Sequence, residues 1–158
     1  MLSSLITFIH VDPSGASVAN LTTNGLAKLF WAERGPRRSR MKTNRKEIIK
    51  LKECLKQIEY FTNKNNSLAF SELDAEFHKI ILNICGNKWI IQIRDNLGSF
   101  IYRSRIKSLS VPGRLKRSLE EHRKIMESLK KHNSAEADRL SQIHMENTVI
   151  NILKNGGL

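Results

Sequence analysis

The chain has 158 residues, of which 40% are hydrophobic, and a formal net charge of +12 from 27 Lys and Arg against 15 Asp and Glu. This length suits one domain with a sizeable core and is short for two. The apolar runs are too short to span a membrane, and two cysteines form no disulfide framework, so we expect a protein of the reducing cytoplasm. The basic balance fits either an anionic partner, such as nucleic acid or a small carboxylate, or a merely cationic surface.

Residues 1–42 differ in character from the rest of the chain. They contain a short apolar run, several turn signals, a Gly-Pro pair and the basic cluster Arg37, Arg38 and Arg40. The apolar run lacks the basic flank and the length of a signal peptide. Because a short cluster of arginines is more often a solvated tail than a nucleic-acid contact, we expect an irregular or partly disordered basic lead-in here.

From residue 43 onward the apolar residues recur every three or four positions, as in amphipathic helices. This pattern predicts five helices, which cover about 43–61, 67–85, 88–109, 112–132 and 133–154. No segment after residue 43 has the alternation of a strand. The sequence therefore predicts an all-α fold, an antiparallel helical bundle over residues 43–155.

Particular residues mark the ends and contacts of these helices. Gly86 is a stop signal for the second helix, and Pro112 fits the first turn of the fourth. Asn133 followed by Glu136 predicts a capping box at the start of the last helix. We expect Gly98 to allow a close helix crossing. The inner face of the last helix is expected to carry Ala137, Leu140, Ile143 and Ile150.

A polar pair interrupts the apolar face of the helix predicted at 67–85. Asp74 and His78 are four residues apart, so both side chains project from one helix face within chelating reach of a single ion. A carboxylate and an imidazole directed into a core need partners or a metal. The apolar residues around them are Leu73, Phe77, Ile80, Ile81 and Ile84.

Two further histidines, His122 and His144, lie on apolar faces of the two later helices. Taken singly, each is more often a satisfied core histidine than a metal ligand. Taken with Asp74 and His78, they supply one carboxylate and three imidazoles, a donor set suited to zinc, nickel, manganese or iron. We expect one metal centre built from these four residues and exclude His132, which is expected to be exposed.

A metal with an open position can activate water for hydrolysis or hold the carboxylate of a small ligand. Hydrolysis needs a general base near the metal, such as the Glu of an H-E-x-x-H helix. Here Lys79 follows His78, and Glu121, which precedes His122, is expected to point away from the core. The sequence therefore favours binding over catalysis, and we expect no enzyme.

Holding a carboxylate requires additional cations or amides near the metal. Arg103, Arg105 and Asn147 are the candidates, although arginines on helices often extend their charge into water. These three residues complete the predicted site.

Residues 44–154 resemble the FCD domain, the all-helical effector-binding domain of FadR-type GntR-family transcription regulators. The resemblance implies that Asp74, His78, His122 and His144 bind a divalent metal, zinc or nickel ahead of manganese or iron. It also implies that the metal helps bind a small organic acid and that binding alters DNA affinity through a homodimer. The matching segments are LDAEFHKIILNICGNKWI, SLEEHRKIMESLKKHNSAEADRL and SQIHMENTVINIL.

The family carries an N-terminal winged helix-turn-helix, and residues 1–43 do not resemble one. We therefore expect contact with DNA only through a winged-helix domain that is not visible in this chain. The predicted function is the ligand-sensing domain of a cytoplasmic regulator with no membrane contact. Two alternatives stay open: a small metal-dependent hydrolase that uses the same four residues, and a metal-free helical dimerisation module in which the histidines are structural.

Overall fold

The computed structural model describes residues 43–86 and 88–154. Within them lie six helices and no strand, so the predicted all-α fold is confirmed. The lead-in predicted for residues 1–42 lies outside the described residues. The helices are α4 (Arg45–Asn63), α5 (Ser67–Cys85), α6 (Lys88–Asn96), α7 (Gly98–Leu109), α8 (Arg114–Lys130) and α9 (Ser134–Lys154).

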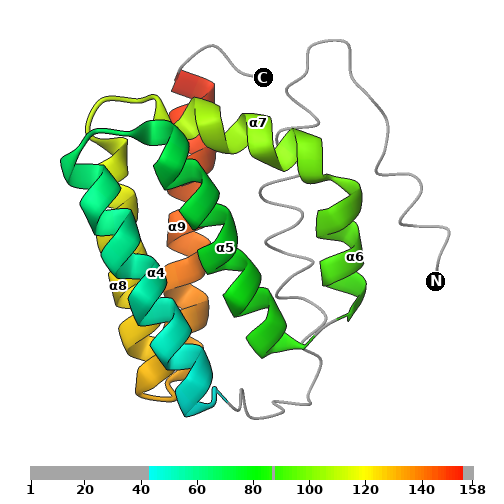
Figure 1. Cartoon of the computed structure of the whole chain (residues 1–158). Helices are drawn as coiled ribbons and strands as arrows, with labels where there is room; N and C mark the ends of the chain where they lie inside the picture. The colour runs from blue at the N-terminus through cyan, green and yellow to red at the C-terminus, as the bar shows by residue number, and fades with distance from the viewer. Residues whose placement is uncertain (1–42, 87, 155–158) are drawn as a thin grey trace, which may run out of the picture.

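Four of these helices, α4, α5, α8 and α9, run alongside one another as an up-and-down bundle (Figure 1). α4 packs against both α5 and α8, and α9 packs against α8. α7 lies across one end of the bundle, where it contacts α5, α8 and α9, and α6 returns the chain from α5 to α7. Among the described residues, no helix is both long enough and apolar enough to cross a membrane.

The apolar core lies mainly between α4, α5 and α8. Leu51, Ile58, Phe70, Phe77 and Ile125 are almost completely buried in it. Burial of each such side chain contributes about 1.5–3 kcal/mol, which makes this face the main source of stability. Asp74 and His78 share α5 with Phe70 and Phe77, so the same helix serves the core and the polar cluster.

Several predicted helix ends are confirmed. Gly86 ends α5 in the left-handed conformation, with φ +66°, and its N–H donates to the carbonyl of Leu82. The Asn133 side chain accepts a hydrogen bond from the N–H of Glu136 at 3.1 Å, which is one half of the predicted capping box, while the Glu136 carboxylate accepts from Arg139. A full capping box that the sequence analysis missed begins α4, where the side chains of Asn44 and Glu47 bind each other's backbone N–H.

The single helix predicted over 88–109 is wrong, because α6 ends at Asn96 and α7 begins at Gly98. The break redirects the chain across the end of the bundle, and a periodic apolar pattern cannot show it. The expected close crossing at Gly98 is also wrong, since a Cβ there would meet no atom of the described residues within 4 Å. Pro112 precedes α8 instead of joining its first turn, and Gly113, with φ +73°, is the N-cap.

The inner face predicted for the last helix is only partly correct. Ala137 is buried, but Ile143 and Ile150 are 37% and 46% exposed. Instead, His144 and Ile152 are the other buried residues of α9. The helix is turned so that His144, and not Ile143 or Ile150, faces the interior.

Candidate metal centre

Three histidines from three helices converge in the interior of the bundle. They are His78 of α5, His122 of α8 and His144 of α9, and each offers a ring nitrogen within 4.8 Å of the nitrogens offered by the other two. The ring centroids lie 4.7–5.1 Å apart. Residues separated by up to 66 positions in the sequence therefore form one cluster that can share an ion.

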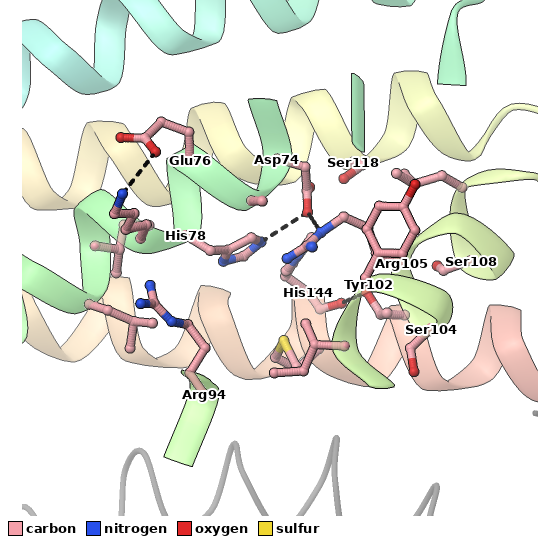
Figure 2. A pocket seen from close by; sticks show the side chains of 18 of the residues that line it. Asp74, Glu76, His78, Arg94, Tyr102, Ser104, Arg105, Ser108, Ser118 and His144 are labelled. Atoms are coloured by element: carbon pink, nitrogen blue, oxygen red, sulfur yellow. Dashed lines mark hydrogen bonds and ion pairs between the residues drawn. The ribbon is translucent and has the colours of Figure 1, made fainter. Parts of the chain in front are cut away.

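Asp74, one turn before His78 on α5, lies against this cluster and is buried. Its Oδ1 lies 3.4 Å from Nε2 of His122, and its Oδ2 lies 3.8 Å from Nε2 of His78. Arg105 of α7 donates from Nε to Oδ2 at 2.5 Å (Figure 2). The four residues predicted as ligands thus lie together, with the histidines closest to one another and the carboxylate beside them.

Within the described residues, neither ring nitrogen of His122 makes a hydrogen bond, although the side chain is 0% exposed. Its ring stacks on Phe77 with centroids 4.4 Å apart. A buried polar group without a partner costs about 1–3 kcal/mol. A metal shared with His78 and His144 would bind one of these two nitrogens and so remove part of that cost, and imidazole nitrogens beside a carboxylate are a donor set that divalent metals bind well.

Glu121 supports the cluster from the neighbouring flank of α8. Its Oε2 accepts a hydrogen bond from Nδ1 of His144 at 2.6 Å, which leaves Nε2 of that ring free to bind a metal. The same carboxylate accepts from Arg114 and from the amide of Asn147, each at 2.8 Å. The prediction that Glu121 points away from the interior is wrong, because α9 packs on the flank of α8 that carries it.

A cavity of about 670 Å³ adjoins the cluster, with walls formed by α5, α6, α7, α8 and α9. Asp74, His78, His144 and Arg105 line it (Figure 2). A volume of a few hundred to a thousand Å³ is usual for small-molecule sites. The polar cluster therefore forms part of the wall of a space large enough for a small organic ligand.

The sequence profile of the FCD domain matches residues 37–147, more than two thirds of the chain. This chain belongs to the FCD domain family. Its domain is accordingly of the effector-binding class found in GntR-family transcription regulators. No curated protein matches the chain in sequence.

The three ligand-binding residues predicted for this FCD domain occupy different places. Arg105 lines the cavity and contacts Asp74. Asn147 is not among the lining residues and instead donates to Glu121. Arg103 lies on the exposed side of α7 and is also not among the lining residues. Only Arg105 is placed to touch a molecule in the cavity.

Nearby charges and burial together keep the donor atoms of Asp74, His78 and His122 in the protonation state that binds metal. Burial alone would raise the pKa of the Asp74 carboxyl, but His78, His122 and Arg105 outweigh burial and hold that pKa well below its usual range. Burial lowers the pKa of His78 to about 4, against the opposing effect of Asp74. Burial also lowers the pKa of His122. At neutral pH the Asp74 carboxyl is therefore deprotonated, and the imidazoles of His78 and His122 are neutral.

Proposed function

We propose that this FCD domain is a metal-dependent sensor of a small carboxylate and that it controls DNA binding as a homodimer in the cytoplasm. The observation that carries the proposal is the convergence of His78, His122 and His144 beside the cavity, which His78 and His144 line, with neither nitrogen of His122 hydrogen-bonded to a described residue. In this proposal Asp74 completes the ligand set. In this proposal, DNA is contacted only through a winged-helix domain.

The proposed metal is zinc or nickel ahead of manganese or iron, because three imidazoles and one carboxylate suit the borderline metals. A bound metal supplies a positive charge with an open coordination position for an anionic oxygen. The chain's own residues hold the donor atoms in place. Glu121 fixes the tautomer of His144, and Arg105 holds Oδ2 of Asp74.

We assign Arg105 the role of a second contact to the carboxylate. Its guanidinium has five N–H donors, of which the hydrogen bond to Asp74 uses only one. Its side chain is 15% exposed and lines the cavity. Arginine is well suited to planar, bidentate recognition of carboxylates. The charge of Arg105 thus lies beside Asp74 of the proposed metal centre and on the wall of the cavity.

The arrangement supports sensing better than the two alternatives. A hydrolase needs a free general base, but Asp74 and Glu121, the carboxylates in contact with the imidazoles among the described residues, are paired with Arg105 and Arg114. A metal-free structural role would leave the buried nitrogens of His122 without partners at a cost in stability.

The test removes His122, the proposed metal ligand whose ring nitrogens make no hydrogen bond to any described residue. We expect the wild-type chain, purified without a His-tag and titrated with zinc, to bind one equivalent and to rise in melting temperature. His122→Leu should bind zinc at least about 100-fold more weakly, since a central ligand is lost. In EDTA the variant should unfold at the same or a higher urea concentration than wild type, because two unpartnered polar atoms are gone.

His132→Leu is the matched control, because His132 is exposed and lies outside the cluster. It should leave zinc affinity unchanged. Equal zinc affinity of the His122→Leu variant and wild type would contradict the proposed centre. The second half of the test is binding of butyrate by calorimetry, which should require bound zinc; butyrate binding of equal strength in EDTA would refute metal-dependent sensing.

A further inference from the structure

The cavity continues beyond the histidine cluster to a polar end between α7 and α8. Ser108 of α7 and Arg114 and Ser118 of α8 line it there. In Figure 2, Ser108 and Ser118 lie on the side of Arg105, away from Arg94 on the other side of His78. The polar end and the cluster are therefore parts of one continuous space.

Each of the three side chains at this end has a polar atom without a partner. Arg114, Ser118 and Ser108 are only 1%, 1% and 2% exposed. Nε of Arg114 and the hydroxyls of both serines make no hydrogen bond within the described part of the chain. Buried polar atoms are almost always hydrogen-bonded in folded proteins. Three unpartnered donors at one end of one cavity indicate a place for an acceptor supplied by a ligand.

Two other serines that line the same cavity show the ordinary arrangement. Ser104 donates its hydroxyl to the carbonyl of Phe100 at 2.9 Å, and Ser141 donates to the carbonyl of Ala137 at 2.7 Å. A helical serine can thus satisfy its hydroxyl on its own helix. Within the described part of the chain, the hydroxyls of Ser108 and of Ser118 on α8 make no such hydrogen bond.

The balance of charge gives the class of ligand. Arg105 pairs with Asp74, and Arg114 pairs with Glu121 at 2.8 Å, so these four charges cancel. Imidazoles that bind a metal are neutral. A divalent metal would therefore leave two uncompensated positive charges in a buried space. A monocarboxylate neutralises one of them, whereas a dianion neutralises both, and buried charge is costly without its counter-charge.

We propose that Arg114, Ser108 and Ser118 form a second anion subsite and that the ligand of this domain is a small dicarboxylate. One carboxylate binds beside Arg105 at the metal centre, and the other accepts hydrogen bonds from the Arg114 Nε and the two serine hydroxyls. This inference rests on the proposed function, because the first carboxylate is the one that the metal centre holds.

The experiment compares acids that differ in the second carboxylate. Calorimetry on the zinc-loaded full chain measures butyrate against malonate, succinate and glutarate, three dicarboxylates of increasing length. We expect at least one dicarboxylate to bind about ten-fold or more tightly than butyrate, as for hydrogen bonds to a charged group. Equal affinities for butyrate and all three dicarboxylates would overturn the subsite.

Serine variants then locate the second contact without disturbing the ion pair of Arg114. Ser108→Ala and Ser118→Ala should each lower affinity for the preferred dicarboxylate about five-fold or more, with butyrate and zinc affinities unchanged. Ser104→Ala is the control in the cavity wall, since its hydroxyl is already bonded to Phe100. Ser71→Ala is the second control, because its hydroxyl is also unpartnered but it does not line the cavity.

The outcomes separate the two proposals. If butyrate binds with zinc present but the dicarboxylates gain nothing, the subsite fails and the metal-dependent sensor stands. If no acid binds the zinc-loaded chain, the sensor fails and the subsite fails with it. An equal loss of dicarboxylate affinity in the Ser104→Ala control would also refute the assignment, since the effect would then not follow the unpartnered hydroxyls.

Discussion

Glu121 supports the candidate site in several ways, although its predicted orientation was wrong. One carboxylate accepts hydrogen bonds from His144, Arg114 and Asn147. Burial raises the pKa of the Glu121 carboxyl, but His144 and Arg114 outweigh burial and lower that pKa below its usual value. The carboxyl is therefore ionised at neutral pH. An ionised acceptor at Nδ1 makes the opposite nitrogen of the ring a better metal donor.

Glu121→Gln should therefore weaken zinc binding by about 10- to 100-fold, the usual cost of losing a carboxylate behind a ligating histidine. The matched control is Glu120→Gln, since Glu120 is exposed and pairs with Arg123 outside the cluster. Competition with a coloured zinc chelator measures both affinities. A Glu121→Gln variant that binds zinc like wild type would show that His144 needs no ionised partner at Nδ1.

Some residues of the candidate site can be predicted from sequence, and others cannot. Asp74 and His78 share a face because of their spacing alone, and His122 and His144 stand out as polar residues on apolar faces. Glu121 gives no such signal, because its importance depends on which flank of α8 receives α9. Arg103 and Arg105 are equivalent by residue type, and only the rotation of α7 separates them.

Among the elements, the helix ends show where local chemistry decides structure. Gly86 and the cap residue Asn133 act within a few positions, so short motifs predict them. Asn44 has the same kind of local motif, Asn followed three residues later by Glu, although its cap was not predicted. The break between α6 and α7 is different, because the apolar pattern continues across Leu97 and the turn is set by packing of α7 against α5 and α9. Long-range packing of this kind leaves no local signature.

Two glycines allow a matched test at this scale. Gly86→Ala should lower the free energy of unfolding by about 1 kcal/mol, since an L-residue is strained at φ +66°. Gly98→Ala should leave it unchanged or raise it by up to about 1 kcal/mol, because alanine is the better helix former. A Cβ at either position meets no atom of the described part of the chain within 4 Å, so the backbone conformation makes the difference. Urea unfolding measures both; equal effects would contradict the left-handed end of α5.

Across the whole molecule, the buried cluster links stability to pH. The unfolded chain protonates His78 near the ordinary imidazole pKa of 6.5, whereas burial lowers the pKa in the folded chain to about 4. Between these values the unfolded state binds more protons, so lower pH favours unfolding. The carboxyl of Asp74, with its pKa held low, adds a further loss of stability at still lower pH.

The metal-free protein should therefore lose on the order of 3 kcal/mol of stability between pH 6.5 and pH 4 through His78. Urea unfolding in EDTA across this range is the measurement. His78→Gln should flatten the slope, while His132→Asn, at an exposed position, should keep it. A curve that does not respond to removal of His78 would mean that this imidazole is protonated equally in both states.

The three imidazoles belong to helices that are far apart in the sequence. His78 lies before α6 and α7, and His122 and His144 lie after them. An ion bound by all three imidazoles closes a loop of chain that includes α6 and α7. The three ligands come together only in the folded bundle, so the ion binds the folded form and stabilises it by mass action. Chelation should then make the segment between α5 and α8 the first to be cut by a protease.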